Sequence, residues 1–126
     1  MATVNLDGFG HVEAETVSTN KTLDAGDSGV VQNVTATCTV TLPAAAAGTA
    51  GVTFPIRVGA EGITVTVSPN SGDKIVGNGF TAADDKDAVA TSQPAGSYIV
   101  LKAVNEATTD SAFVVERVLG TWTREA

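Results

Sequence analysis

The stretch ITVTVSPNSGDKIVGNG, residues 63–79, contains the two signals that recur through the chain. Ile63, Val65 and Val67 alternate with threonines, and a period of two places the branched apolar side chains on one face of a β-strand. The corner at residues 69–73 is made of turn-forming residues and predicts a hairpin loop with its glycine at positive φ. Because Asn, Ser and Asp side chains bond to the local backbone in such turns, the corner is interpreted as a strand reversal rather than a chemical site.

The same alternation recurs along most of the chain and predicts an all-β protein. A length of 126 residues fits one domain, for which we assign residues 15–126. About seven to nine short strands separated by turn signals are typical of a compact antiparallel β-sandwich or barrel. The main expected strands are residues 29–35, 37–42, 51–59, 63–67, 97–104 and 112–123.

Individual residues refine this pattern. Cys38 alternates with threonines and is expected in the core. Pro55 lacks an N–H, which favours an edge strand or a bulge at residues 51–59. Residues 97–104 are apolar on both faces, which suits a central strand. Gly120 is expected to bend the last strand so that Trp122 packs against the sheet.

Two segments remain ambiguous. Residues 43–48, PAAAAG, would permit a single helical turn but contain too few alanines for an independent helix. Residues 81–91, TAADDKDAVAT, would begin a helix if Thr81 and Asp84 formed a capping box. The alternative is an acidic loop followed by a short strand.

Residues 1–14, MATVNLDGFGHVEA, show no clear period and are interpreted as an irregular N-terminal arm. They are too apolar for a tail without a partner, and two glycines would let the chain bend around the phenylalanine between them. We expect the arm to contact a partner or a neighbouring subunit; the alternative is that it adds a strand to its own sheet. The candidate contact residues are Val4, Leu6, Phe9, His11 and Val12.

Composition limits the classes of function. A net charge of −7 would repel a phosphate backbone, so no nucleic-acid partner is expected. No apolar run approaches the ~20 residues of a membrane span, and no secretory signal is expected at the N-terminus. Because Cys38 is the only cysteine, the chain can form neither an intramolecular disulfide nor a cysteine-based zinc site.

Candidate catalytic and metal-binding groups are weak. His11 and Cys38 are the only histidine and the only thiol, and a buried strand cysteine usually behaves as a small hydrophobe. The acidic run 84–87 would suit a glycosidase only with aromatic platforms for sugar, and the chain has one Trp and one Tyr. Residues 24–29 lack the acidic pattern and final Glu of an EF-hand loop. We therefore expect no catalytic residue, no cofactor and no bound metal.

Residues 22–104 carry a more specific pattern. A Thr/Val strand ends in Leu-Pro-Ala, an apolar strand ends in Val-Gly, and a Val-Thr-Val strand leads into Pro-x-x-Gly-Asp-x-Ile-x-Gly. This order of elements resembles small structural proteins of tailed bacteriophages, a family that includes head decoration (cement) proteins and pieces of tail fibres and spikes. The elements that carry the resemblance are residues 41–44, 54–59, 64–67 and 69–79, preceded by TLDAGDSGVV.

The resemblance implies a virion component and no enzyme. The short chain, which has no fibrous or coiled-coil segment, and the apolar arm favour the head over the tail. The expected function is that of a bacteriophage capsid decoration protein, made in the host cytoplasm. It would bind the outside of the major capsid protein lattice as a homotrimer and stabilise the head. The alternatives are a tail fibre, spike or other appendage domain that binds a host receptor or glycan, and a small hydrolase.

Overall fold

The computed structural model describes residues 3–6, 12–45, 51–77, 80, 85–104 and 112–125. These residues form twelve strands and one 3₁₀ turn, η1 (Ala25–Asp27). The strands are β1 (Thr3–Leu6), β2 (Val12–Val17), β3 (Lys21–Thr22), β4 (Val31–Val34), β5 (Cys38–Thr41), β6 (Thr53–Val58), β7 (Thr64–Ser68), β8 (Lys74–Val76), β9 (Ala88–Thr91), β10 (Tyr98–Val104), β11 (Ala112–Leu119) and β12 (Thr123–Arg124).

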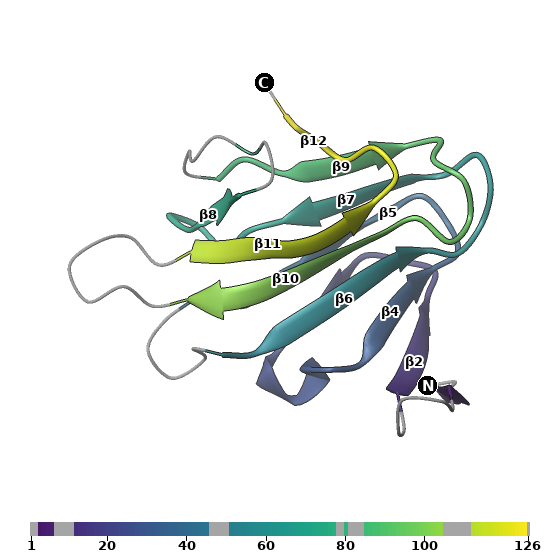
Figure 1. Cartoon of the computed structure of the whole chain (residues 1–126), viewed down its shortest axis with the longest axis horizontal. Coiled ribbons are helices and arrows are strands. Elements are labelled where there is room, and N and C mark those ends of the chain that lie inside the picture. The colour runs from purple at the N-terminus through teal and green to yellow at the C-terminus, as the bar shows by residue number, and fades with distance from the viewer. Residues whose placement is uncertain are drawn as a thin grey trace.

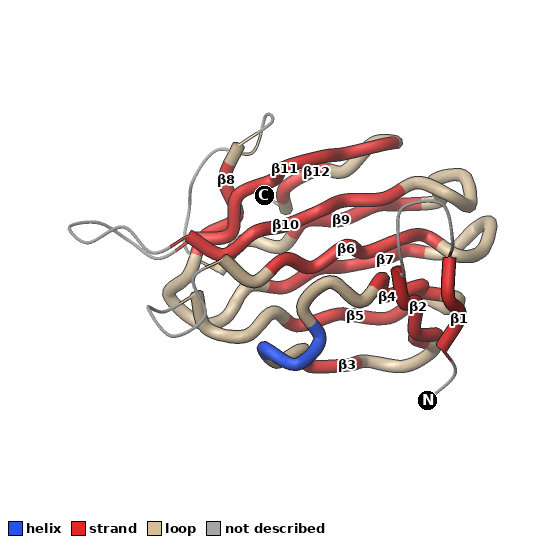
Figure 2. Tube along the Cα trace, turned by 60° about the horizontal axis from the view of Figure 1, so that its bottom comes forward, coloured by secondary structure: helices blue, strands red, loops and turns tan. Residues whose placement is uncertain are grey.

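The strands form two sheets packed face to face, as Figures 1 and 2 show. One sheet has seven strands in the order β1-β2-β4-β6-β10-β11-β8, and the other has five in the order β12-β9-β7-β5-β3. The predicted all-β sandwich is confirmed. The expected strand number of about seven to nine was too low, because two- and three-residue strands such as β3, β8 and β12 are too short to leave a periodic signal.

The expectation of an antiparallel fold is wrong for half of the molecule. From β2 to β7, successive strands alternate between the two sheets, so every second strand returns to the same sheet in the same direction. The pairs β2–β4, β4–β6, β3–β5 and β5–β7 are therefore parallel. Later in the chain, β9, β10, β11 and β12 are added by antiparallel pairing. Alternation reports which face a residue lies on, and it carries no information on the direction of the neighbouring strand.

The core lies between the sheets and is lined by the apolar residues of the alternating strands. The rings of Phe54 on β6 and Phe113 on β11 lie 5.9 Å apart between centroids at an interplanar angle of 41°. Cys38 is buried in the opposite sheet, as predicted. Gly120 has φ +87°, and Trp122 beyond it is buried in the same core, which confirms the predicted bend.

Pro55 lies on a central strand, so the edge-strand interpretation is wrong. β6 pairs with β4 on one side and with β10 on the other. The N–H of Gly29 donates to the carbonyl of Thr53 at 2.8 Å, which places the polar backbone groups of residues 53 and 55 on the β4 side. The β4 register begins only at Gln32 opposite Ile56. The missing N–H of Pro55 therefore falls where the β4 ladder starts, and the β10 ladder is unaffected.

The corner at residues 69–73 is a turn, but not the turn of a hairpin. β7 lies in the five-stranded sheet and β8 in the seven-stranded sheet, so the corner carries the chain from one sheet to the other. Gly72 has φ +83°, as predicted, and its N–H donates to Asp85 Oδ1 at 2.8 Å. Asp73 Oδ2 accepts the N–H of Ala45 at 2.8 Å. The polar atoms of the corner are thus used to hold neighbouring loops.

The N-terminal segment differs from the irregular arm that was expected. Thr3–Leu6 forms β1, which pairs antiparallel with β2, and Val12–Val17 forms β2, which pairs parallel with β4. The alternative, a strand added to the chain's own sheet, describes these residues, and the described β domain begins before residue 15. β1 and β2 have short polar–apolar runs that are too irregular for a period-two signal to stand out.

Of the two ambiguous segments, one is partly answered. Ala88–Thr91 is strand β9, as in the loop-and-strand alternative, while residues 81–84 lie outside the described residues. The expected helical turn at residues 43–48 also lies mostly outside them. The described part of the chain contains no helix of the length and apolar character needed to cross a membrane.

Candidate functional site

The predicted contact residues at the N-terminus are only partly placed. Val4 and Leu6 lie on β1, and Leu6 is directly opposite Val12 on β2. Phe9 and His11 lie outside the described residues. The structure therefore brings the backbones of three of the five candidates together at one edge of the seven-stranded sheet.

The Asp-Gly segment at residues 24–29 forms a cap for the 3₁₀ turn η1. Asp24 caps η1 by accepting the N–H of Gly26 at 2.8 Å, and Asp27 Oδ2 accepts the N–H of Asp24 at 3.0 Å. The other oxygen of Asp27 lies 3.6 Å from the ammonium group of Lys21. Each carboxylate thus has a structural partner, and the described residues contain no group of three or more His, Cys, Asp or Glu side chains that could hold a metal ion.

Lys21 belongs to a polar cluster that bridges the two sheets. From β3 in the five-stranded sheet, its Nζ donates to Glu15 on β2 and, at 3.1 Å, to Gln32 Oε1 on β4. Gln32 has no exposed surface, and its Nε2 donates to the carbonyl of Val30 at 3.2 Å. Every polar atom of this buried amide has a partner. The cluster is therefore interpreted as a structural hydrogen-bond network that joins the two sheets at the edge of the sandwich, and not as a reactive centre.

The acidic residues at 85 and 87 also have structural partners. Asp85 occupies the left-handed region at φ +60° and accepts the N–H of Gly72. Burial raises the pKa of Asp87, which a hydrogen bond from Ser68 partly offsets and the charge of Glu125 reinforces. Asp84 lies outside the described residues. No described pocket joins these carboxylates into a cleft.

Cys38 is buried, and burial raises the pKa of its thiol. A raised pKa lowers the thiolate fraction at neutral pH, which makes the sulfur a poor nucleophile. Its proposed partner His11 lies outside the described residues, so the Cys/His pair is not tested.

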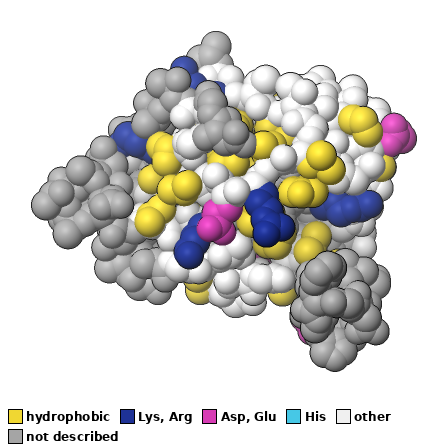
Figure 3. All heavy atoms as spheres, in the orientation of Figure 1, with side chains coloured by type: hydrophobic (Ala, Val, Ile, Leu, Met, Phe, Trp, Pro, Cys, Tyr) yellow, Lys and Arg dark blue, Asp and Glu magenta, His cyan; other side chains and the backbone are white. Residues whose placement is uncertain are grey.

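A different surface emerges on the outer side of the seven-stranded sheet. The apolar–basic face, as we name it, is defined by Arg57, Tyr98, Val100, Lys102, Arg117 and Leu119 from the adjacent strands β6, β10 and β11. Figure 3 looks onto this side and shows hydrophobic and Lys or Arg side chains intermingled across it. Three of the chain's seven Lys and Arg residues gather here, although the whole chain carries −7.

The strand register fixes the neighbours on this face. Tyr98 lies opposite Arg57 on one side and opposite Leu119 on the other. Val100 lies in the next row, between Pro55 and Arg117, with Tyr98 and Lys102 two residues away along its own strand. Val100 is thus the centre of an apolar strip with cationic side chains around it.

A β-bulge in β11 shapes the face. The register shifts between Val100 and Leu101, so Glu116 is the extra residue between the partners of these two positions. Both Glu116 and Arg117 are exposed. Before the bulge the odd-numbered residues Phe113 and Val115 face the core, and after it the even-numbered Val118 does. The bulge therefore turns Arg117 and Leu119 outward beside Val100 and Tyr98.

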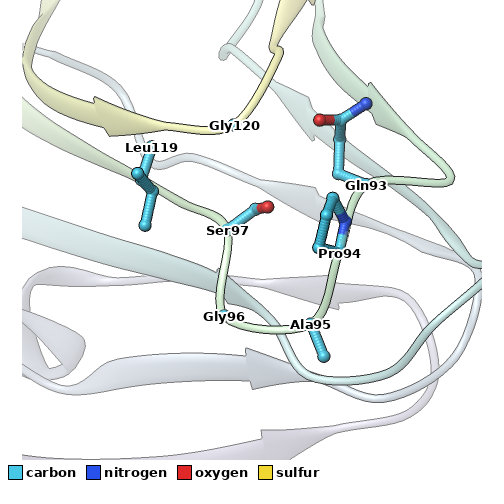
Figure 4. A pocket seen from close by; sticks show the side chains of 7 residues that line it. All are labelled: Gln93, Pro94, Ala95, Gly96, Ser97, Leu119 and Gly120. Atoms are coloured by element: carbon cyan, nitrogen blue, oxygen red, sulfur yellow. The ribbon is translucent and has the colours of Figure 1, made fainter.

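Two hollows flank the Tyr98–Leu119 pair. One, of about 320 Å³, is lined by Val31, Pro55, Arg57, Tyr98, Val100 and Arg117. The other, of about 380 Å³, lies where the β9–β10 loop meets the end of β11; Figure 4 shows Leu119 and Pro94 on either side of Ser97 there. Leu119 is 54% exposed and is the only large apolar residue so exposed in the described part of the chain. Both hollows are open parts of one surface rather than enclosed active-site cavities.

The cations of the face are only weakly neutralised. Arg57 Nη1 donates to the neutral Asn33 Oδ1 at 2.6 Å. No ion pair involves Arg57, Lys102 or Arg117 among the described residues. Glu116 is the single carboxylate on the outer side of β4, β6, β10 and β11. The face is therefore positive on an otherwise acidic molecule.

Sequence reasoning missed this face, although part of its signal was visible. The apolar character of residues 97–104 on both faces predicted a central strand, which is confirmed, since β10 lies between β6 and β11. The same observation implies apolar side chains on the solvent side, where a central strand of a two-layer fold has no covering layer. The gathering of Arg57 and Arg117 could not be found in the sequence, because it depends on β6 and β11 both pairing with β10.

Comparison of the chain with protein-family models, with curated proteins and with solved structures returns no match.

Proposed function

We propose that the chain is a structural component of a bacteriophage head, a decoration protein that binds the outer surface of the major capsid protein lattice and stabilises it. The observation that carries the proposal is the apolar–basic face, an exposed apolar strip ringed by cations on a rigid sheet. Exposed apolar patches of this kind mark protein-binding surfaces. The sequence resemblance to small phage structural proteins supplies the kind of partner.

The proposed mechanism is mechanical and requires no catalytic group. Each copy bridges neighbouring capsid subunits and adds buried area that resists outward pressure from packaged DNA. A standard interface buries roughly 1,600 Å² in total, and many equivalent contacts across a lattice add to one another. A homotrimer would present three copies of the face to the shell and increase the avidity of attachment.

The open character of both hollows favours a binding protein over an enzyme. A small-molecule active site is usually a concave pocket that buries most of its ligand. The clusters that could have carried hydrolysis are used in caps and loop contacts, as in the pairs Asp24–Gly26 and Asp85–Gly72.

The test is binding of the purified protein to expanded phage capsids that lack their decoration protein. Saturable binding at one copy, or one trimer, per lattice site, with increased resistance of the capsids to heat, is expected. Binding to host cell-surface glycan and not to capsids would overturn the proposal in favour of a tail appendage. Sedimentation of the free protein and of protein eluted from capsids measures the oligomeric state, and a strict monomer in both would refute the trimer.

A further inference from the structure

We infer that the apolar–basic face binds an extended acidic polypeptide segment in which one apolar side chain is flanked by two carboxylates. The inference rests on the proposed function only for which protein supplies the segment, which would then be the major capsid protein. The chemistry of recognition follows from the face itself.

The charge of the face favours an acidic partner. Arg57, Lys102 and Arg117 lie on adjacent strands of a chain whose net charge is −7. Among the described residues, no ion pair satisfies them. A guanidinium group that has no carboxylate partner favours one, because Arg can bind a carboxylate through two parallel hydrogen bonds.

The spacing of the cations around Val100 matches that of side chains in an extended peptide. Lys102 and Tyr98 lie two residues either side of Val100 on β10, a step of about 6.8 Å. Arg57 lies opposite Tyr98 on β6 and Arg117 lies opposite Val100 on β11, so their Cα atoms are two strand spacings across and two residues along, roughly 12 Å apart. Residues four apart in an extended peptide lie about 13.6 Å apart, which the long Arg side chains can span. A segment with carboxylates two residues before and after an apolar side chain therefore matches the cations around Val100.

The hollow around Val100 has a mainly apolar lining. The hollow around Val100 is lined by Val31, Pro55 and the single tyrosine of the chain, Tyr98. Aliphatic and proline side chains form a site for an apolar side chain, whereas the face offers one aromatic ring for stacking a sugar. A protein segment therefore fits the surface better than an anionic glycan does.

Glu116 offers a test of whether the face attracts acidic groups. The bulge exposes its carboxylate next to Arg117, where it repels an incoming acidic group. Glu116→Gln should therefore tighten binding about two- to threefold.

The experiment is an NMR titration of the full chain with acetylated pentapeptides. The probe Glu-Thr-Leu-Thr-Glu should shift the signals of Arg57, Tyr98, Val100 and Arg117 and bind less tightly as salt rises, since 0.1 M salt screens charges beyond about 10 Å. The matched peptides Gln-Thr-Leu-Thr-Gln and Glu-Thr-Ser-Thr-Glu should each bind at least fivefold more weakly. Equal affinity for the glutamate and glutamine peptides would overturn the inference.

Two double variants with the same net charge localise the effect. Arg57→Gln/Arg117→Gln should weaken peptide binding at least tenfold, whereas Lys86→Gln/Arg124→Gln, near β9 and β12 of the five-stranded sheet, should change it less than twofold. Equal losses in both would indicate a net-charge effect and contradict a specific face. Binding of dextran sulfate without binding of the peptide would replace the inference with an anionic-glycan site.

The same variants separate the two proposals. If the protein binds the peptide on this face but does not bind capsids, the inference stands and the proposed function fails. If it binds capsids but not the peptide, and Arg57→Gln/Arg117→Gln leaves capsid binding unchanged, the proposed function stands and the inference fails.

Discussion

The two outer faces of the sandwich contrast in chemistry although their strands follow the same alternation. On the five-stranded sheet, the threonine face consists of Thr39, Thr41, Thr64, Thr66 and Thr91, with Thr39 opposite Thr66 and Thr64 opposite Thr91. On the seven-stranded sheet, the corresponding outward positions form the apolar–basic face.

The difference between the two outer faces shows which residue types folding requires at outward strand positions and which it does not. Both faces cover the same core, and the inward residues of the two sheets are mainly buried apolar side chains. Threonine suits an outward strand position because its branched side chain packs on a pleated sheet and its hydroxyl meets water. Two arginines and an exposed leucine at the corresponding positions of the other sheet leave cations and apolar surface in water, which folding alone does not require. This difference is the basis for proposing that sheet as the binding surface.

Phe113 tests the inward side of the proposed binding sheet. Phe113→Ala should lower the free energy of unfolding by about 3–5 kcal/mol, because a fully buried ring packed on Phe54 is replaced by a cavity. Urea unfolding measures the loss. The outward neighbour variant Val114→Ala should cost less than about 1 kcal/mol. Loss of peptide binding by correctly folded Phe113→Ala protein would show that the two sides of the sheet are not independent.

Gly120 tests the link between the two sheets, since it lies between β11 and β12. A Cβ there would lie 2.6 Å from Ser97 Oγ, and its φ of +87° strains any other residue. Gly120→Ala should cost about 1–3 kcal/mol from the backbone alone, with the clash in addition. Gly62→Ala is the matched control, because Gly62 has φ +76° but no atom within 4 Å of the added Cβ. Equal melting temperatures for the two variants would show that the contact with Ser97 is unimportant.

Cys38 tests the core beneath the threonine face. Cys38→Ser should lower stability by about 1–3 kcal/mol, because it places a hydroxyl in an apolar site, and should leave binding per folded molecule unchanged. Since burial also raises the pKa of the thiol, the native protein should react slowly with thiol reagents at neutral pH. Labelling of native Cys38 as fast as in urea would contradict its burial.

A pair of isosteric exchanges tests the comparison directly. Val100→Thr makes the apolar–basic face resemble the threonine face, and Thr66→Val does the reverse on the other sheet. Each should change stability by less than about 1 kcal/mol, because both side chains are outward and β-branched. Titration with the Glu-Thr-Leu-Thr-Glu peptide should show a loss of at least threefold for Val100→Thr alone. A similar loss for Thr66→Val would remove the functional distinction between the faces.

Asp87 tests electrostatics at the edge of the five-stranded sheet, where the smallest effect is expected. Burial raises its folded-state pKa above the ordinary value of 3.8, so between these two values the folded protein binds more protons than the unfolded chain. The contribution of this carboxyl to stability therefore decreases as pH rises through that window and is constant above it. Asp87→Asn should remove this component, seen as a pH-dependent difference between the unfolding curves of wild type and variant.

Glu125→Gln provides the control for Asp87, because removing that neighbouring charge should bring the Asp87 pKa closer to its ordinary value. A wild-type minus Asp87→Asn difference that increases with pH would contradict the assigned direction of the shift.

Much of the fold was predictable because side-chain alternation and turn residues indicate the local structure of the segments that contain them. Alternation at residues 37–42 and 63–67 placed the inward side chains correctly, and positive φ at Gly72 followed from turn chemistry. Pro55 misled the prediction, because the sequence does not reveal that its missing N–H would meet the unpaired start of the β4 ladder. The prediction of a hairpin at residues 69–73 was wrong for a similar reason, because turn residues do not indicate which sheet the next strand joins.

By itself, the sequence determined that the chain is all-β, which residues of 37–42 and 63–67 point inward, and that the molecule is acidic with a single buried thiol. Only the tertiary structure decided the parallel winding of β2 to β7 and the assembly of the apolar–basic face. The physical reason is range. Side-chain alternation and turn propensity act between residues a few positions apart, whereas Arg57 and Arg117 become neighbours only because β10 pairs with the strands that carry them.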